Sequence, residues 1–394
     1  MSRHQGKKWL FAILHFVVLV TLVVGVAGCT AGPTPTETKP TPTPQPQATE
    51  PPAPTEAPAT ATAEAPPAPA GNIPAPFADP SKKPRVALIR EVGEGGFMER
   101  YLAGAQSMAD ELGVELVESN ARGDQAKMVT MVENAIQQRV DAIIISHGRT
   151  DTLQPAIEAA MKAGIKVLTF DLVIDNPDVP EIEQDDMLIG FMLSKKLATD
   201  YGGNADVIYI NVGGFAPLVK RDRAWQDFKW RYTGLKEAAQ IGAVTDNTAA
   251  DTQTRMEAAL KEHPDADAVL AMWDEFAKGA VRAIMQAGKA DQVKVYSVDI
   301  TNEDIQMMTQ EGSPWVATVA TDSYNVGRLA VRGAAAMIAG EDLGKYLLVE
   351  PVLITQDFLR QNSISNMDEL VKALPSLGES QLAWYDWMCA LRNK

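Results

Sequence analysis

The stretch DAIIISHGRTDTLQPAIEAAMKAGIKVLTFD, residues 141–171, contains the repeating unit on which the fold of this chain is built. Its apolar run at 142–145 and its β-branched, aromatic-ended run at 167–170 have the length of buried strands. Between them, residues 153–163 follow a helical pattern that ends at Gly164. A strand, a helix and a second strand in this order predict a βαβ unit with parallel strands.

The same alternation continues in both directions along the chain. The expected strands lie at 86–89, 114–117, 142–145, 167–170, 207–210, 269–272 and 293–298, and the expected helices at 99–112, 124–139, 153–163, 186–201, 225–240, 252–262 and 276–287. The alternation starts again after Asp186, so the chain contains two successive βαβ series. Two such series predict an α/β protein with two doubly wound, Rossmann-like lobes and parallel sheets.

The first part of the chain has the composition of a targeting and spacer segment. Basic residues precede an uncharged stretch that ends in Val-Ala-Gly-Cys at 26–29, the pattern of a secretory signal whose Cys29 is lipidated before cleavage. The alternative is an uncleaved transmembrane helix in the same stretch. Of the 25 prolines, 16 lie between 31 and 80. We therefore interpret 1–28 as a signal peptide and 29–82 as a lipid-anchored, extended tether.

Composition excludes several classes of function. The net charge of −15 argues against nucleic acid or an anionic membrane surface as a partner, since both bind basic patches. With Cys29 lipidated, Cys389 has no second cysteine for an intrachain disulfide. The four histidines are scattered, and the sequence contains no Walker loop, Gly-x-Ser-x-Gly or His-Glu-x-x-His motif. We therefore expect neither a metal nor a cofactor.

Polar residues stand at the predicted carboxyl ends of strands, where open parallel sheets bind their ligands. Asp171 and Asp299 each follow a predicted strand directly. We interpret both carboxylates as acceptors for ligand hydroxyl groups, the alternative being solvated turn residues. Trp273 is either a stacking wall of the site or a core residue. Asp274 either caps the next helix or contacts ligand.

Short motifs between about Arg85 and Leu353 have the order and spacing of a known family. The motifs are Val86 to Ile89, Gly104-Ala105-Gln106, Asp141 to Ser146, Ala163 to Val167, Phe170-Asp171, Ala268 to Met272 with Asp274-Glu275, Gly279, Val298-Asp299 and Ala317-Thr318. With these motifs the chain resembles the type I periplasmic sugar-binding proteins of ABC transporters, close to the ribose and rhamnose binders. The resemblance implies two lobes that close on a sugar.

The resemblance also implies a division of the chain. Three crossing strands would join the lobes near 184–186, 320–322 and 346–351. The expected parts are an N-terminal lobe at 83–185 plus 322–346, a C-terminal lobe at 186–321 plus 347–360, and an extension at 361–394. The aromatic residues of the extension most simply pack on a lobe, and binding of a partner is the alternative.

Further site residues follow from the resemblance. The family stacks an aromatic side chain on the sugar at the position of Phe97. It donates hydrogen bonds from an arginine at the position of Arg221 or Arg223. Other positions that align with polar groups of the family's cleft, and that fit strand-end capping equally well, are Ser146, Thr321 and Asp322.

Two departures from the family bear on the ligand. Leu172 stands where ribose and galactose binders usually have arginine, and Trp273 stands where ribose binders usually have asparagine. The pocket would thus have fewer hydrogen-bond donors and more apolar surface. A deoxysugar, a polyol or another small ligand is therefore expected rather than ribose or glucose itself.

Taken together, these features predict an extracytoplasmic solute-binding lipoprotein and not an enzyme. It would capture a monosaccharide, deoxysugar or polyol by hinge closure and deliver it to an ABC transporter permease. The alternatives are a ligand-sensing subunit for a chemoreceptor or kinase, a binder of a nucleoside or other non-sugar ligand, and an extracytoplasmic enzyme on the same scaffold. We expect a monomer on the outer face of the cytoplasmic membrane, held there through the lipid anchor only.

Overall fold

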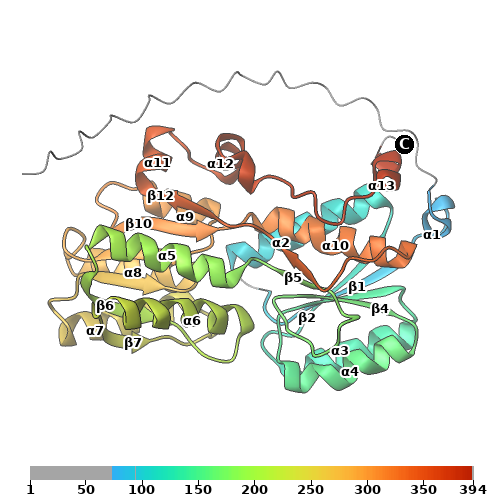
Figure 1. Ribbon diagram of the computed structural model, residues 1–394, viewed down its shortest axis with the longest axis horizontal. Coiled ribbons are helices and arrows are strands. Elements are labelled where there is room, and N and C mark those ends of the chain that lie inside the picture. The colour runs from blue at the N-terminus through green and yellow to red at the C-terminus, as the bar shows by residue number, and fades with distance from the viewer. Residues whose placement is uncertain (1–72, 94, 393–394) are drawn as a thin grey trace, which may run out of the picture. The chain divides into compact units, whose positions relative to one another are not determined.

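The computed structural model describes residues 73–93 and 95–392 of the chain. The predicted signal peptide, Cys29 and most of the predicted tether lie outside these residues. The described chain forms two six-stranded sheets, and each sheet lies with its helices in a lobe of its own (Figure 1). The prediction of two doubly wound α/β lobes is confirmed.

The helices and strands alternate along the chain. The N-terminal lobe begins with α1 (Ala75–Ala78), β1 (Arg85–Arg90), α2 (Gly96–Leu112), β2 (Glu115–Asn120), α3 (Gln125–Gln138), β3 (Ala142–Ser146), α4 (Thr150–Lys162), β4 (Lys166–Phe170) and β5 (Glu181–Glu183). The C-terminal lobe follows with α5 (Asp186–Asp200), β6 (Asn204–Ile210), α6 (Ala216–Arg231), β7 (Gly234–Ile241), α7 (Thr248–Glu262), β8 (Ala268–Ala271), α8 (Asp274–Gln286), β9 (Lys294–Val298), α9 (Asn302–Thr309) and β10 (Trp315–Ala320). The remaining elements are α10 (Ser323–Ala339), β11 (Tyr346–Leu348), β12 (Val352–Thr355), α11 (Gln356–Gln361), α12 (Met367–Ala373), a 3-10 turn (Pro375–Leu377) and α13 (Asp386–Arg392).

The sheet of the N-terminal lobe has the strand order β11-β5-β4-β3-β1-β2, and its strands pair in parallel. Parallel sheets are covered on both faces, so successive apolar side chains enter different cores. In β1, Val86 and Leu88 pack with residues of α2 and α10. Ala87 and Ile89 pack instead with residues of α3 and α4. All these strands therefore present their carboxyl ends at one edge of the sheet.

The sheet of the C-terminal lobe has the order β12-β10-β9-β8-β6-β7, in which β12 alone pairs antiparallel. One predicted element in this lobe is wrong. The sequence predicts a helix at 225–240, but α6 ends at Arg231 and residues from Gly234 form the edge strand β7. Leu-Lys-Glu-Ala-Ala-Gln at 235–240 consists of good helix formers. Pairing of this segment with β6 outweighs that local preference.

The chain passes between the lobes at three places that lie between consecutive elements. Gln184 and Asp185 connect β5 to α5, Thr321 and Asp322 connect β10 to α10, and 349–351 connect β11 to β12. The Oγ1 of Thr321 donates a hydrogen bond of 2.6 Å to the side-chain oxygen of Gln184. The first two passages are thus bonded to each other, and we call the three together the hinge.

The C-terminal segment makes a further passage that the sequence did not predict. Leu377 is buried in the core of the C-terminal lobe. Two residues later, Glu379 forms an ion pair of 2.8 Å with Arg328 of α10, a helix packed on the N-terminal lobe. Asn325, also in α10, donates a hydrogen bond of 3.1 Å to the carbonyl of Leu377. We call residues 377–382 the C-terminal strap, because they connect the two lobes beside the hinge.

The aromatic residues of the extension pack on the N-terminal lobe, as the sequence predicts. Trp387 is buried, with its ring centroid 4.8 Å from that of Phe77. The ring centroid of Trp384 lies 4.6 Å from the guanidinium carbon of Arg332 and 5.2 Å from that of Arg392. In residues 73–93 and 95–392, no helix has the length and apolarity needed to cross a membrane.

Candidate ligand-binding site between the lobes

Two aspartates at strand ends point into the space between the lobes. Asp171 follows β4 and Asp299 follows β9, and both have left-handed backbone conformations, with φ of 51° and 71°. Aspartate tolerates this conformation better than most residues. The N–H of Asp171 donates to the carbonyl of Ile182 at 3.0 Å, and that of Asp299 to the carbonyl of Val319 at 3.1 Å. These hydrogen bonds to neighbouring strands therefore fix the two turns, and the backbone leaves the extended conformation at both aspartates.

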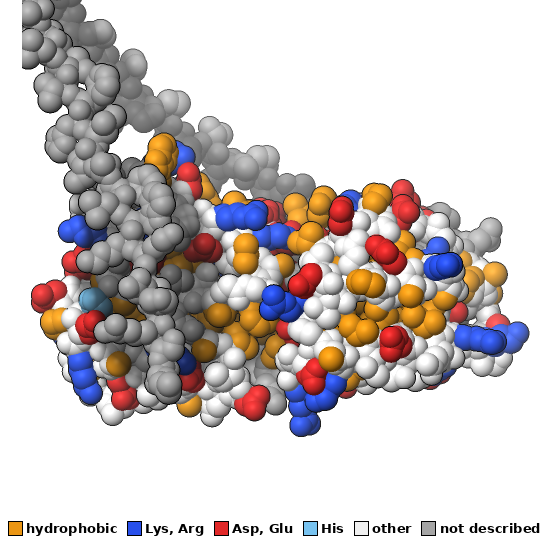
Figure 2. Space-filling view, turned by 90° about the horizontal axis from the view of Figure 1, so that it is seen from below, with side chains coloured by type: hydrophobic (Ala, Val, Ile, Leu, Met, Phe, Trp, Pro, Cys, Tyr) orange, Lys and Arg blue, Asp and Glu red, His pale blue; other side chains and the backbone are white. Residues whose placement is uncertain are grey.

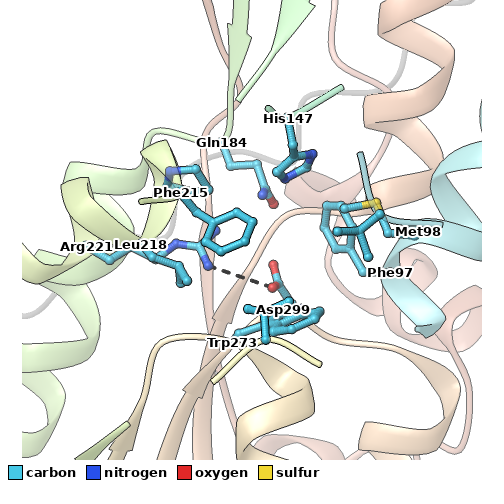
Figure 3. Close-up of a pocket in the computed structure, with 12 residues that line it drawn as sticks. Phe97, Met98, His147, Gln184, Phe215, Leu218, Arg221, Trp273 and Asp299 are labelled. Atoms are coloured by element: carbon cyan, nitrogen blue, oxygen red, sulfur yellow. Dashed lines mark ion pairs between the residues drawn. The ribbon is translucent and has the colours of Figure 1, made fainter. Parts of the chain in front are cut away.

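A cavity of about 60 Å³ lies where the strand ends of the two lobes meet (Figure 3). The residues that line it are Val92, Phe97, Met98, His147, Gln184, Phe215, Pro217, Leu218, Arg221, Val244, Trp273 and Asp299. Phe97 and Met98 open helix α2 of the N-terminal lobe, whereas Arg221 and Asp299 belong to the C-terminal lobe. Figure 3 shows the Phe97 and Phe215 rings on opposite sides of Asp299 and Gln184. The cavity thus combines aromatic walls with a few polar groups.

Arg221 is the positive centre of the site. Its side chain is only 3% exposed, and its Nε donates a hydrogen bond of 2.8 Å to Asp186. One Nη1 hydrogen is donated to the carbonyl of Met272 at 2.8 Å, and the same nitrogen lies 3.9 Å from a carboxylate oxygen of Asp299. Burial alone would lower the pKa of Arg221, but the charges of Asp186, Asp299 and Asp171 raise it overall. The guanidinium therefore stays charged and held in place.

Asp171 and Asp299 each have a buried carboxylate oxygen without a hydrogen-bond partner among the described residues. Asp171 accepts a hydrogen bond of 3.2 Å from Gln184 through one oxygen, which also lies 3.7 Å from Nε2 of His147. Its other oxygen and Oδ1 of Asp299 are buried and unpaired. Buried polar atoms are rarely left unpaired in folded proteins. Oδ1 of Asp299 is therefore an unpaired acceptor on a residue that lines the cavity, whereas Asp171 lies beside the lining residues Gln184 and His147.

Burial sets the protonation of these groups. It raises the pKa of Asp299 to about 7, against the opposing effect of Arg221. Burial, followed by the negative charge of Asp186, raises the pKa of Asp171 well above its ordinary value. Burial and then the charge of Arg221 lower the pKa of His147 to about 3, so this imidazole is neutral. In the described chain, no group of three or more His, Cys, Asp or Glu side chains is placed to hold a metal ion.

The structure brings Phe97, Arg221, Trp273 and Asp299 to the lining of the cavity, with Asp171 bonded to the lining residue Gln184. Ser146 and Thr321 lie behind the lining. Ser146 is hydrogen-bonded to Nδ1 of His147 at 3.0 Å, and Thr321 donates to Gln184 at 2.6 Å. Both hydroxyls therefore orient a lining side chain.

Other predicted residues are not brought to the cavity. Arg223 is exposed and lines a separate hollow with Lys220. Asp274 turns back toward its own helix, where it accepts from the N–H of Glu275 and lies 3.3 Å from Nζ of Lys278. Leu172 is buried in the core of the N-terminal lobe and does not line the cavity. Asp322 caps α10 and forms an ion pair of 2.7 Å with Arg100, also away from the cavity lining.

Several lining residues were missed by the sequence reasoning. His147 follows β3 with a φ of 63°, the same kind of position as Asp171, so the strand-end argument could have found it. Gln184 lies in the first passage of the hinge, and nothing in its local sequence indicates a site. Phe215 and Leu218 surround the start of α6, where only the tertiary fold places them beside Arg221.

Two α/β lobes with a cavity at the carboxyl ends of both sheets are the architecture of hinged solute-binding proteins. Residues 86–342, well over half of the chain, match a family model described as the periplasmic binding protein domain. The chain therefore belongs to the periplasmic binding protein family, as its motifs predict. Proteins of this family work outside the cytoplasm.

Curated relatives of the chain include sugar and polyol binders. The ribose import binding protein of Salmonella typhimurium is 28% identical over 286 residues, which cover 71% of this chain and 93% of that protein. The xylitol-binding protein of Mycolicibacterium smegmatis is 23% identical over 270 residues, which cover 68% of this chain and 74% of that protein. These relatives are binding proteins and not enzymes.

Solved structures include a much more similar protein. The 5-methylthioribose transporter solute binding protein from Thermotoga lettingae, in complex with 5-methylthioribose, is 69% identical with a TM-score of 0.79. The match covers 82% of this chain and 99% of that one. A sugar ABC transporter protein from Yersinia enterocolitica is 30% identical with a TM-score of 0.79, covering 83% of this chain and 99% of that one. The chain is thus similar in sequence and fold to binding proteins of sugar transporters.

Proposed function

We propose that this chain captures a pentose whose terminal hydroxyl is replaced by an apolar thioether, with 5-methylthioribose as its ligand, and delivers it to an ABC importer. The protein from Thermotoga lettingae that is 69% identical holds this compound. The sequence-based expectation of a deoxysugar agrees with it, because 5-methylthioribose has sulfur in place of one hydroxyl oxygen. Delivery to a permease rests on the transporter relatives.

The observation that carries this proposal is the mixed character of the cavity. Two carboxylate oxygens, on Asp171 and Asp299, are buried without a partner, which suits a ligand with several hydroxyl donors. Leu218, Val244 and other apolar side chains line much of the rest. A fully hydroxylated sugar would leave some of its polar groups against this apolar surface, whereas a methylthio group gains by being buried there.

In this proposal each site residue has a distinct role. Asp171 and Asp299 accept hydrogen bonds from ring hydroxyls, and Arg221 donates to a hydroxyl or ring oxygen. Phe97 and Trp273 pack against the C–H surface of the sugar. Each hydrogen bond that involves a charged group contributes roughly 1.5–3 kcal/mol to binding, so the ionisable residues contribute most to holding the ligand in one orientation. Ser146 and Thr321 support the lining and do not touch the ligand.

The test is a calorimetric titration of the purified protein with 5-methylthioribose, ribose and xylitol. We expect 5-methylthioribose to bind at least about tenfold more tightly than ribose, since one apolar group in a fitted pocket discriminates by roughly 10- to 200-fold. A preference for ribose or xylitol would agree with a sugar- or polyol-binding protein but would refute 5-methylthioribose as the ligand. The absence of binding by all three compounds would refute the proposed ligand class.

The distribution of charge on the surface favours a small molecule rather than a nucleic acid as the ligand. On the face in Figure 2, Lys and Arg side chains are interspersed with Asp and Glu. Binding to a nucleic acid backbone depends on positive charges that gather on one face. The net charge of −15 points in the same direction.

We also propose that Cys29 is the lipidated first residue of the mature protein. Acylation needs the thiol, so Cys29→Ser should release the protein from membranes or leave an uncleaved precursor. Cys389→Ser is the matched control, because Cys389 is exposed and free in the folded domain. Membrane fractionation and intact mass measure both effects. Unchanged mass and fractionation of Cys29→Ser would contradict the anchor.

A further inference from the structure

The cavity continues toward a larger hollow between the lobes. A groove of about 370 Å³ lies beside the cavity of about 60 Å³. Val92, Val244 and Trp273 line both spaces. Each of these three side chains is half-buried, as expected for residues with solvent-facing space on one side and the cavity on the other. The three residues therefore lie at the boundary between the cavity and the groove, and we call them the apolar wall.

Both lobes contribute to the apolar wall. Val92 follows β1 in the N-terminal lobe, whereas Val244 follows β7 and Trp273 follows β8 in the C-terminal lobe. Trp273 is held in place by an edge-to-face contact with Phe276, with ring centroids 5.5 Å apart. Because the wall takes residues from both lobes, it is complete only when the lobes are closed. A ligand group that packs on all three residues therefore favours the closed form over the open form.

The two sides of the wall differ in chemistry. The cavity side is mostly apolar and includes Phe97, Phe215 and Leu218; its polar lining residues are His147, Gln184, Arg221 and Asp299. On the groove side the lining is polar, and it includes Asn120, Asp246, Asn247, Thr245 and Glu275. An alkyl chain gains free energy by burial on the cavity side but loses part of that gain where it meets polar groups that need water. The wall is thus a boundary for apolar substituents.

We propose that the apolar wall receives the thioether substituent of the ligand and limits its length to about one carbon beyond sulfur. This inference rests on the proposed 5-alkylthio pentose ligand. The hydroxyls of the ring then face Asp299, whose Oδ1 is unpaired, and Arg221 beside it, so the end without a hydroxyl is left for the apolar part of the lining. A longer chain has to displace a wall residue or enter the polar groove.

The test compares 5-methylthioribose, 5-propylthioribose and ribose on the wild type and on Val244→Ala. Val244→Ala shortens the wall without adding a polar group. Val316→Ala is the matched control, since Val316 is half-buried in β10 of the same lobe and lines neither space. Val92→Ala repeats the test from the N-terminal lobe and serves if Val244→Ala fails to fold. Calorimetry gives each dissociation constant.

The expected result is a change in selectivity. The wild type should bind 5-propylthioribose at least about tenfold more weakly than 5-methylthioribose, and Val244→Ala should reduce this ratio about tenfold. Affinity for ribose should change less than affinity for 5-propylthioribose, because the C5 hydroxyl of ribose is shorter than a propylthio group and contacts less of the wall. An unchanged ratio in both wall variants, or equal changes in the Val316→Ala control, would overturn the inference. Failure of the wild type to bind 5-methylthioribose would instead refute the proposed function, and this inference with it.

Discussion

Acidification should favour closure of the ligand-free protein. In the closed lobes, burial raises the pKa of Asp299 from 3.8 to about 7. We expect open lobes to hydrate this carboxylate and return its pKa to the ordinary value. The closed form then binds the proton more tightly than the open form does. Above about pH 7, closure therefore carries the full free-energy cost of burying the charged carboxylate of Asp299. This cost decreases as the pH falls and disappears at about pH 4.

The size of the effect follows from the shift in pKa. Each unit is equivalent to about 1.4 kcal/mol, so lowering the pH from about 8 to about 5 should favour closure by about 3 kcal/mol. Asp171 adds to this in the same direction, because burial and the charge of Asp186 raise its pKa as well. An effect of this size shifts the ratio of closed to open molecules by roughly a hundredfold.

Small-angle scattering measures this closure as a decrease in the radius of gyration. We expect the ligand-free wild type to be more compact at about pH 5 than at about pH 8. Asp299→Asn should respond less, because an amide is neutral at both pH values. Asp227→Asn is the control, since Asp227 is an exposed residue of α6 outside the cavity. A radius that does not depend on pH, or an equal response in Asp299→Asn, would refute the reasoning.

Three further predictions concern single features of the structure. Asp171→Asn should weaken binding of 5-methylthioribose by roughly ten- to hundred-fold in calorimetry, because an amide NH2 donor replaces one acceptor oxygen. Arg221→Met should lower the free energy of unfolding by about 3–5 kcal/mol in urea at about pH 8, since buried Asp186 loses its ion-pair partner at 2.8 Å. A Gly-Ser insertion after Gly378 lengthens the C-terminal strap, so it should increase the ligand-free radius of gyration and weaken binding several-fold by reducing the closed population. The same insertion after Gly312, in an exposed turn, should do neither.

Each of these predictions has an outcome that contradicts it. Intact affinity in Asp171→Asn would remove this carboxylate from the ligand site. An unchanged urea midpoint in Arg221→Met would mean that the surrounding carboxylates do not need its charge. Equal radii for the insertions after Gly378 and Gly312 would show that the strap does not limit opening of the lobes.

The sequence predicted the parts of the site that depend on local pattern. Asp171 and Asp299 were found because each follows a short apolar run, and parallel strands bring such residues to one edge of a sheet. The choice between Arg221 and Arg223 needed the tertiary structure. Two positions apart on α6, these side chains differ by about 200° around the helix axis, so only one of them faces the cavity.

The parts that the sequence missed depend on contacts between distant segments. Gln184 reaches the cavity because the first hinge passage lies beside the second, where Thr321 orients its amide. The C-terminal strap depends on Glu379 meeting Arg328 and Arg332, about fifty residues earlier in the chain. Neither the contact between Gln184 and Thr321 nor the ion pairs of Glu379 are marked in the sequence by a periodic pattern or a turn motif.

The backbone at Asp171 and Asp299 decides which substitutions can separate binding from folding. Both residues have positive φ, which asparagine tolerates and which alanine adopts at a cost of roughly 1–2 kcal/mol. An alanine variant would therefore lose stability whatever the role of the carboxylate, and its lowered melting temperature would not distinguish a ligand residue from a turn residue. Asparagine keeps the shape and removes the charge, and glycine removes the side chain without backbone strain. If Asp299→Asn and Asp299→Gly both lose affinity while their melting temperatures stay close to that of the wild type, the carboxylate binds ligand. If both keep their affinity, Asp299 is a turn residue and the site assignment fails there.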